Sequence, residues 1–378
     1  MYSLRWCLCF GLFAGCVVPL ELLGPPDAGQ DAGAQLLPAV TLTVGSSQTC
    51  TTTANGTLYC FGDNVTGQLG VGDTTQHPGP TRVDGGTLRW VAAAIGERHT
   101  CALATDAVAY CWGANAEGAL GLGDAVARLV PARSLGAPYS ALTAGDGFTC
   151  ALKSGGELFC WGANGESQLG FFDLAKPGAP SLQPLRVGAG LYRQVAAGQG
   201  HACALGVDGG LECWGRNTEG QLGSGSALGN VPEPSPVING PWLSVAATQG
   251  STCAIRADRT LWCWGEGPSG TSRTPVRVEA ASDWAQISVN QFHYCGRRGA
   301  SLYCWGRGIE GQLGLNDNSP RAAPTQVMGA WTTVGASRFH TCGIQTDGRL
   351  YCWGRNEQDQ LGLKDSVRRS VPTLVPLP

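Results

Sequence analysis

Fourteen of the seventeen cysteines in this chain form seven pairs with nearly constant spacing, and they are the residues best placed to do chemistry. The pairs are Cys50 and Cys60, Cys101 and Cys111, Cys150 and Cys160, Cys203 and Cys213, Cys253 and Cys263, Cys295 and Cys304, and Cys342 and Cys352. Cysteines spaced so regularly indicate either metal sites or an oxidising compartment. Zinc-binding cysteines usually lie two to four residues apart, and these pairs do not. The spacing therefore favours disulfides over metal sites.

Histidines are the next candidates for metal binding or acid–base chemistry. Four of the five stand two residues before the first cysteine of a pair: His99, His201, His293 and His340. Because they hold one register in different repeats, we expect them to be spread around the molecule. A repeated hydrogen bond at a strand end is favoured over a shared metal or catalytic site. His77 stands alone, and we expect it in a solvated loop.

Acidic residues recur a few positions after a Leu-Gly pair or its equivalent. They are Asp73, Asp124, Asp173, Asp317 and Asp365. Calcium loops need clustered acids, so turn formation is the favoured role for these aspartates. The sequence contains no nucleophile elbow, P-loop or dinucleotide fingerprint, and we predict no catalytic residue, metal or cofactor.

Phe172 is the one candidate binding residue. It aligns with Gly72, Gly123 and Lys364 of other repeats, which is a turn position. Its ring is therefore expected either to be exposed as a contact anchor or to pack on its own long loop. The neighbouring Phe171 aligns with apolar residues and is expected to lie in the core.

The first residues predict export. Arg5 precedes an apolar stretch from Trp6 to Ala14. This stretch is too short to span a bilayer, which takes about 20 residues. It is typical of the apolar core of a signal peptide, which we place at residues 1–15.

The segment Leu12-Phe13-Ala14-Gly15-Cys16 resembles the cleavage site of a bacterial lipoprotein, where small residues precede an acylated cysteine. We therefore predict a lipid anchor on Cys16, followed by a flexible tether over residues 16–38. The alternative is an ordinary secreted protein that is cleaved nearby.

The elements that position the cysteines repeat seven times. Successive first cysteines lie 51, 49, 53, 50, 42 and 47 residues apart, a period typical of propellers and solenoids. Each unit shows about four short strands, as in Val91–Ile95, the segments around Cys101 and Cys111, and Pro324–Val327. Four strands are what a propeller blade needs. We predict an all-β, seven-bladed propeller over residues 39–378.

Hairpin geometry predicts the cysteine pairing. The two cysteines of a unit flank a turn such as Thr346-Asp347-Gly348, so they face each other on antiparallel strands. Directly opposed residues have Cβ atoms within about 5.5 Å, which is compatible with a disulfide. The separation of nine in unit six needs only a turn that is one residue shorter. All seven disulfides are therefore predicted to form within a unit.

Two further details follow from the repeat. Four residues after the second cysteine stand Asn64, Asn115, Asn164, Asn217, Gly267, Gly308 and Asn356. Asn and Gly both tolerate a left-handed backbone, so we expect a tight turn with that conformation here. We also expect the strands around Thr41–Val44 and Thr373–Val375 to meet in one sheet and close the ring.

Three repeated motifs carry a family resemblance. Gly-x-x-His-Thr-Cys-Ala-Leu, Asp-Gly-x-Leu-x-Cys-Trp-Gly and Asn-x-x-Gly-Gln-Leu-Gly resemble the repeats of the regulator of chromosome condensation family over about residues 40–377. The resemblance implies a seven-bladed propeller. Its best-known eukaryotic member is a guanine nucleotide exchange factor that binds chromatin, and a secreted bacterial relative inhibits β-lactamases by protein–protein contact. The disulfide pairs depart from the nuclear pattern, and unit five lacks Gln-Leu-Gly.

Together these features favour a surface-tethered binding scaffold over an enzyme. We expect it to recognise a protein or polysaccharide through its variable loops, as a monomer in the outer membrane, on the cell surface or in the periplasm. With a net charge of −3, nothing points to nucleic acid, and the membrane contact is the lipid anchor alone. The alternatives are an exchange factor, by family analogy, and an envelope glycan-active enzyme, which needs two converging carboxylates.

Overall fold

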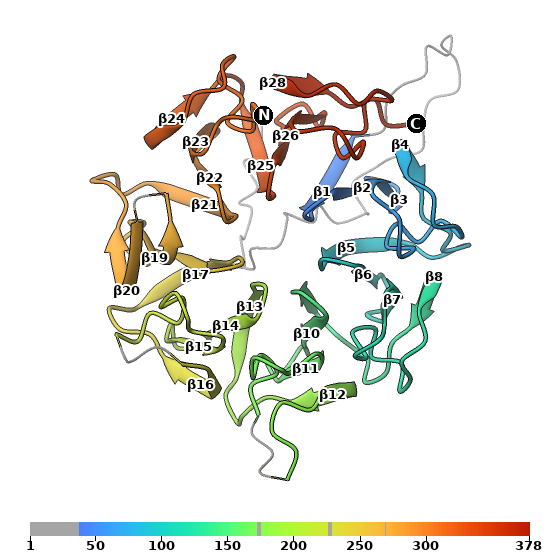
Figure 1. Ribbon diagram of the computed structural model, residues 1–378, viewed down its shortest axis with the longest axis vertical. Helices are drawn as coiled ribbons and strands as arrows, with labels where there is room; N and C mark the ends of the chain where they lie inside the picture. The colour runs from blue at the N-terminus through green and yellow to red at the C-terminus, as the bar shows by residue number, and fades with distance from the viewer. Residues whose placement is uncertain (1–37, 172–174, 226–228, 269) are drawn as a thin grey trace, which may run out of the picture.

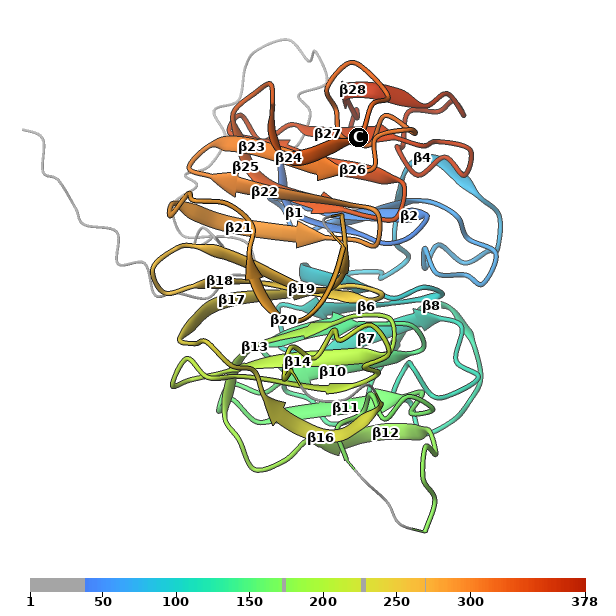
Figure 2. The same cartoon turned by 60° about the vertical axis from the view of Figure 1, so that its left-hand side comes forward.

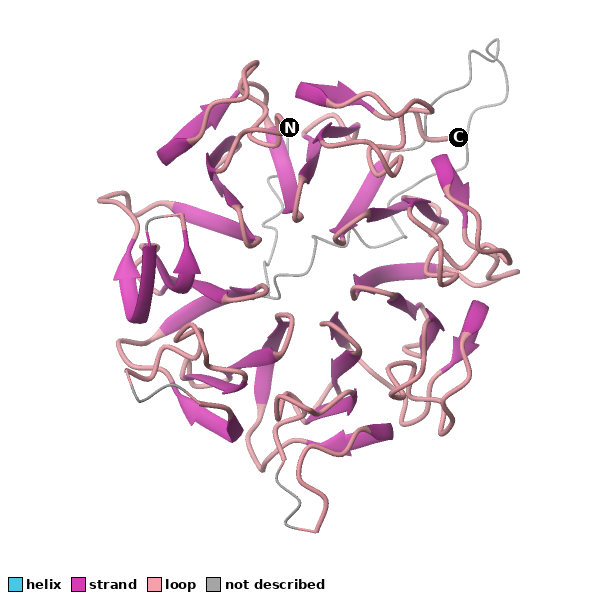
Figure 3. Cartoon of the chain, viewed as in Figure 1, coloured by secondary structure: helices cyan, strands magenta, loops and turns pink. Residues whose placement is uncertain are grey.

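The predicted all-β propeller is confirmed. The computed structural model describes residues 38–171, 175–225, 229–268 and 270–378, which contain strands, turns and loops (Figure 3). The strands form seven four-stranded antiparallel sheets arranged in a ring around a central axis (Figure 1). Within these described ranges, no helix long and apolar enough to cross a membrane is found. The predicted signal peptide, the Cys16 anchor, nearly all of the tether and Phe172 lie outside the described residues.

Each repeat supplies one complete blade. Blade 1 contains β1 (Ala39–Val44), β2 (Gln48–Thr53), β3 (Leu58–Gly62) and β4 (His77–Arg82). Blade 2 contains β5 (Trp90–Ile95), β6 (His99–Ala104), β7 (Ala109–Gly113) and β8 (Arg128–Arg133). Blade 3 contains β9 (Ala141–Ala144), β10 (Phe148–Leu152), β11 (Leu158–Gly162) and β12 (Ser181–Arg186). Blade 4 contains β13 (Tyr192–Ala197), β14 (His201–Gly206), β15 (Leu211–Gly215) and β16 (Val231–Pro236).

The remaining blades follow the same plan. Blade 5 contains β17 (Trp242–Ala247), β18 (Ser251–Arg256), β19 (Leu261–Gly267) and β20 (Gly270–Arg277). Blade 6 contains β21 (Trp284–Val289), β22 (His293–Arg298), β23 (Ser301–Gly306) and β24 (Arg321–Val327). Blade 7 contains β25 (Trp331–Ala336), β26 (His340–Gln345), β27 (Leu350–Gly354) and β28 (Arg369–Leu374). In every blade the first strand is innermost and the fourth is outermost (Figure 1).

The expected closure of the ring by a shared sheet is wrong. β1 belongs to the sheet of blade 1 and β28 to the sheet of blade 7, because each repeat runs from an inner to an outer strand and completes its own blade. Blades 1 and 7 still meet, through packing and through backbone hydrogen bonds, one of which runs from Lys364 N to Pro78 O at 2.8 Å. Ala39 N donates to Gly348 O at 2.9 Å, and Val375 and Leu377 share a buried cluster with Ala39. Ala39 stands where the other blades have Trp or Tyr, so Leu377 fills space beside a small residue.

The predicted pairing of the cysteines within each blade is confirmed at all seven positions. The two cysteines of a pair are directly opposed on the second and third strands of one blade. Their Cα–Cα distances lie between 4.0 and 4.2 Å. From blade 1 to blade 7, the disulfides join Cys50 to Cys60, Cys101 to Cys111, Cys150 to Cys160, Cys203 to Cys213, Cys253 to Cys263, Cys295 to Cys304 and Cys342 to Cys352.

A shorter turn compensates for the closer spacing of the cysteines in blade 6. There the ladder continues to Arg298 and Ser301, so only two residues form the turn. In blade 2 the last backbone bond joins Ala104 and Val108 across three residues. The loss of one turn residue therefore keeps the cysteines of blade 6 opposite each other, as the sequence predicted.

Both faces of each blade are buried, as stacked sheets require. One face presents the disulfide and leucines, and the other presents aromatic side chains, which are mostly tryptophans. At the junction of blades 1 and 2, Cys60 and Leu58 pack with Trp90 and Trp112 in one cluster. Figure 2 shows neighbouring blades, such as those of β17 and β21, lying one above the other. The disulfide of blade 1 thus lies against the aromatic face of blade 2.

The contacts of the Gln-Leu-Gly segment with a tryptophan of the next blade explain why this segment recurs. Trp112 Nε1 donates to Gln68 O of the preceding blade at 2.9 Å. The next glycine along, Gly70, has φ +72°, and a Cβ on it would lie 2.6 Å from Trp112 Nε1. Glycine is therefore needed both for its backbone conformation and for the close approach of the tryptophan. Blade 5 lacks the segment, and there the Tyr294 hydroxyl reaches Ser251 Oγ at 2.9 Å and Glu266 O at 3.2 Å.

The left-handed backbone conformation was expected at the position of Asn64, but it lies three residues later in the chain. A turn does begin at Asn64, whose carbonyl accepts a hydrogen bond from Gly67 N at 2.9 Å, but Gly67 is the residue with positive φ. The same shift holds at Gly118, Ser167, Gly220, Gly311 and Asp359. The asparagine is instead buried, and its side chain braces the loop. Asn64 Oδ1 accepts from Leu69 N at 2.9 Å, and its Nδ2 donates to Asp73 O at 3.0 Å.

Candidate functional site

The ring of blades forms a disc with two ends. One end carries the turns between the first and second strands and the long loops after the third strands, and we call it the loop face. The turn between the first and second strands of each blade lies nearest the centre of the ring (Figure 1). The long loop after the third strand emerges at the same end, because the second and third strands are antiparallel. Arg307 N donates to Phe292 O at 2.7 Å, and Arg355 N donates to Phe339 O at 2.9 Å. These bonds bring the start of the long loop beside the central turn.

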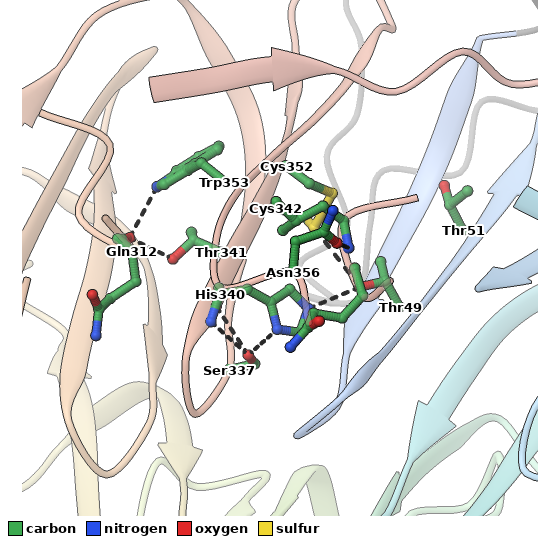
Figure 4. Close-up of a disulfide and its surroundings, with 12 residues drawn as sticks. Thr49, Thr51, Gln312, Ser337, His340, Thr341, Cys342, Cys352, Trp353 and Asn356 are labelled. Atoms are coloured by element: carbon green, nitrogen blue, oxygen red, sulfur yellow. Dashed lines mark hydrogen bonds between the residues drawn. A yellow bond between two sulfur atoms is a disulfide. The ribbon is translucent and has the colours of Figure 1, made fainter. Parts of the chain in front are cut away.

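The four aligned histidines lie beneath the loop face and join neighbouring blades. Their Nε2 atoms contact a threonine of the next blade: His99–Thr149 at 2.8 Å, His201–Thr252 at 2.9 Å, His293–Thr341 at 2.7 Å and His340–Thr49 at 2.9 Å. Thr49 Oγ1 donates to Gln360 O at 3.0 Å, so it accepts its hydrogen bond from Nε2–H of His340 (Figure 4). The repeated hydrogen bond predicted from the register is present, and it connects blades.

These histidines are fully buried and stay neutral at physiological pH. Burial lowers the pKa of His99 to about 4. Burial also lowers the pKa of His201 to about 3, and nearby Arg216 adds to that shift. The pKa of His293 and that of His340 are lowered to about 3 by the same desolvation. A buried, hydrogen-bonded, neutral imidazole stabilises the seam between two blades.

We expect each buried histidine to weaken the fold by about 1 kcal/mol between pH 7 and pH 5.5. A histidine whose native pKa lies below its unfolded value of about 6.5 binds protons mainly in the unfolded chain. Its stabilisation is complete above pH 6.5 and is lost as the pH falls toward the native pKa. His340→Gln copies Gln48, which holds this position in blade 1. Urea unfolding from pH 8 to pH 5 should show a shallower loss of stability in this variant, and equal slopes would contradict the assignment.

The recurring aspartates form turns in the loops. Asp124 Oδ1 accepts from Val126 N at 2.9 Å, and its Oδ2 forms an ion pair with Arg128 at 2.8 Å. The hydrogen bond from Val126 N, with Arg128 next in importance, lowers the pKa of Asp124. Asp317 and Asp365 repeat this arrangement with Arg321 and Arg369, while Asp173 lies outside the described residues. No three His, Cys, Asp or Glu side chains of the described ranges are placed to hold a metal ion.

The structure also shows where His77 and Phe171 lie. His77 was expected in a solvated loop, but it begins β4, is half-buried and contacts Asp73 at 3.2 Å and Thr81 at 3.1 Å. The expectation fails because the loop of blade 1 folds back onto the outer strand. Phe171 is partly buried against the cluster that joins blades 3 and 4, as its alignment indicated.

The residue types at the centre of the loop face differ from blade to blade. The residue before the aligned histidine position is Ser47, Arg98, Gly147, Gly200, Gly250, Phe292 or Phe339 in blades 1 to 7. The residue that bonds to it across the hairpin is Asp63, Ala114, Ala163, Arg216, Glu266, Arg307 or Arg355. Only blades 6 and 7 therefore combine an aromatic residue with an arginine at these positions.

These residues form a compact group that we call the Phe–Arg cluster: Phe292, Phe339, Arg307, Arg338 and Arg355. The two rings are stacked, with centroids 5.5 Å apart and planes at 26°. Arg307 lies 4.9 Å from the Phe292 centroid, and Arg338 and Arg355 each lie 5.2 Å from that of Phe339. Distances under about 6 Å allow cation–π attraction. The sequence interpretation missed this cluster, although a comparison of the seven aligned turns shows both phenylalanines as exceptions.

Comparisons with known proteins agree with this geometry. The repeat described as "Regulator of chromosome condensation (RCC1) repeat" matches residues 55–103, 106–152, 208–255, 300–344 and 347–378. A second form of that repeat matches residues 90–119, 139–168, 192–221 and 331–360.

Individual relatives resemble the chain at lower identity. The Ultraviolet-B receptor UVR8 of Arabidopsis thaliana is 28% identical over 312 residues, which cover 78% of this chain and 59% of that receptor. Human WBSCR16 has a TM-score of 0.77 at 20% identity, covering 85% of this chain and 95% of the other. Prp20p of Saccharomyces cerevisiae has a TM-score of 0.73 at 22% identity, covering 90% and 86%. The chain, with its seven repeats and seven blades, belongs to the regulator of chromosome condensation repeat family.

Proposed function

We propose that the chain is an exported, lipid-tethered scaffold that binds another protein through its loop face. The observation that carries this proposal is that the repeated framework residues contact the protein itself, whereas the residues of the loop face vary between blades. The disulfide, the aligned histidine and the buried asparagine of the framework contact other parts of the protein itself. The residues in and beside the central turns of the loop face differ between blades. They supply the asymmetric surface that recognition of a partner needs.

Known relatives support a protein as the partner. The structure of Prp20p is described together with binding to Gsp1p and histones, so at least one propeller of this fold binds proteins. Seven disulfides indicate an oxidising compartment and weigh against exchange activity on a cytosolic GTPase. A scaffold in the envelope or on the surface of a bacterial cell fits these observations together.

Lipidation at Cys16 has a direct test. We expect the mature chain to begin at Cys16 with an acyl group and to remain with the membrane fraction. Cys16→Ser should release the protein into the soluble fraction, because one or two acyl chains provide the membrane affinity. Mass spectrometry of the mature N-terminus, with fractionation, measures both effects. An intact Met1, or cleavage at another residue, would exclude the lipoprotein assignment.

Binding through the loop face is tested by affinity capture from the detergent-solubilised envelope and the culture fluid of the producing bacterium. Val65 and Ile309 are exposed on long loops of the loop face, at 68% and 45%. Val207 and Ile238 are exposed at the opposite end, at 65% and 46%. Arginine at the first pair should abolish capture of the partner, while arginine at the second pair should leave it intact.

The outcomes of this capture are distinct. A protein retained by the wild type and by the opposite-face variant, but lost in the loop-face variant, supports the proposal. Equal retention by both variants places binding elsewhere on the disc. Failure of the wild type to retain any protein counts against a binding scaffold.

A further inference from the structure

The Phe–Arg cluster is a surface group without an evident structural duty. Phe292 and Phe339 are half-buried, and Arg338 is exposed. In blades 2, 3 and 4 the corresponding turns close with Arg98, Gly147 and Gly200, so a phenylalanine is not required to form the turn. The two rings come from repeats 47 positions apart and meet only because blades 6 and 7 are neighbours.

The cluster carries an excess of positive charge. Arg355 contacts the carboxylate of Glu357, which is exposed. Among the described residues, no carboxylate forms an ion pair with Arg307 or Arg338, and no oxygen accepts a hydrogen bond from either guanidinium. Each guanidinium has five N–H donors in a planar fork that matches a carboxylate. The stacked rings hold these donors at the surface and leave them available to a partner.

In the central turns of blades 1 to 3 and the residues bonded to them, three carboxylates outweigh one arginine, Arg98, so this side of the loop face carries mainly the opposite charge. At the same end of the disc, blades 1 to 3 present Asp63, Glu97 and Asp146 near the centre of the ring. Local donors hold these carboxylates in place: Ser46 contacts Glu97 at 2.5 Å, Gln68 contacts Asp63 at 2.8 Å and Gln199 contacts Asp146 at 3.3 Å. A partner with acidic groups is therefore attracted to blades 6 and 7 and repelled from blades 1 to 3. Such polarity orients a ligand on the face.

We infer that the Phe–Arg cluster is the contact site for an acidic segment of a protein partner, in which carboxylates bind the arginines and an apolar or aromatic side chain packs on the phenylalanine pair. This inference rests on the proposed function and names the part of the loop face that recognises the partner. Aromatic residues and arginine are the side chains that most often dominate binding at protein interfaces.

A protein segment fits better than a nucleic acid. A polyanion that crosses the mouth of the ring meets the carboxylates of blades 1 to 3, while a short acidic segment needs only blades 6 and 7. The disulfides also indicate an oxidising compartment, such as the periplasm or the cell surface.

The test uses the full chain and a library of random twelve-residue peptides displayed on phage. Selection on the wild type should enrich peptides that combine Asp or Glu with an aromatic or large apolar residue. The triple variant R307Q/R338Q/R355Q should lose this enrichment and bind a selected synthetic peptide about tenfold more weakly. Raising salt from about 50 to 500 mM should weaken the wild type and leave the variant little changed.

Matched variants separate recognition from folding and from total charge. R82Q/R133Q/R186Q removes three exposed arginines at equivalent outer-strand positions of blades 1 to 3, and it should bind like the wild type. Arg307→Lys with Arg338→Lys keeps the charge but loses the planar fork, so intermediate binding is expected. Phe292→Ser with Phe339→Ser should also weaken binding. Thermal unfolding of each variant checks that the propeller is intact.

Three results would overturn the inference. One is a set of peptides without acidic residues, or acidic peptides that bind the cluster variant equally well. Another is concentration-dependent dimerisation of the wild type that disappears in the cluster variant, which would assign the cluster to a second copy of the chain. The third is cluster-dependent binding of a labelled twelve-nucleotide single strand at about 150 mM salt. If the envelope capture succeeds while the peptide test fails, the scaffold function stands and only the cluster is misassigned.

Discussion

Reduction of the seven disulfides is expected to leave the denatured chain unable to refold. Each disulfide closes a loop of about ten residues and stabilises the fold by about 3 kcal/mol through the entropy of the unfolded chain. Seven such contributions amount to about 20 kcal/mol, which exceeds the usual total stability of about 5–15 kcal/mol. Every strand pair that carries the bridges also contributes to the packing between blades. The reduced chain should therefore lack the cooperative unfolding transition of the oxidised one.

The measurement is dilution from guanidinium with and without reductant, followed by circular dichroism. The oxidised chain, unfolded and diluted in the same buffer, is the control for irreversible aggregation. All cysteines of the pairs are buried except Cys263, so the native protein should resist mild reductant and alkylation. Non-reducing peptide mapping should recover the within-blade pairs, such as Cys150 with Cys160 and Cys203 with Cys213. A reduced chain that refolds fully, or bridges between blades, would refute this account of the stability.

Removing the two buried side chains at the C-terminus is expected to open the seam between blades 7 and 1. Val375 and Leu377 are 1% and 3% exposed and lie in the cluster that contains Ala39 and Phe61. The double variant Val375→Ala/Leu377→Ala should lose about 3–6 kcal/mol, because it leaves cavities where two distant parts of the chain meet. Deletion of residues 371–378 should lower the melting temperature by many degrees for the same reason.

The control lies on the strand just before the seam residues. Val371 and Leu374 are 40% and 38% exposed on β28, and alanine at both should cost less than about 1 kcal/mol. Differential scanning calorimetry of the two double variants compares buried and exposed positions of similar chemistry. Equal losses in both would mean that the ring does not depend on the C-terminal seam.

Local sequence patterns accounted for much of the framework. The separation of Cys295 and Cys304 by nine residues already indicated a shorter turn, because opposed residues on a hairpin depend only on the residues between them. The register of the aligned histidines indicated a repeated hydrogen bond. It did not reveal that the acceptor, such as Thr49 for His340, belongs to the next blade.

Other expectations failed where neighbouring residues decide the outcome. Asparagine tolerates a left-handed backbone, yet Asn64 uses its side chain to brace the loop and Gly67 takes the positive φ. His77 is half-buried because Asp73 and Thr81 lie within hydrogen-bonding distance of its ring. Residue type alone does not distinguish a backbone role from a side-chain role.

The sequence by itself determined the number of blades, the all-β class and the cysteine pairing, because strand alternation and hairpin spacing act over a few residues. Only the tertiary structure decided how the ring closes and which surface residues meet. Leu377 reaches the cluster of Ala39, and Phe292 stacks on Phe339, because the ring makes separate repeats into neighbours. Contacts of this kind depend on the curvature and order of the blades, which no single repeat encodes.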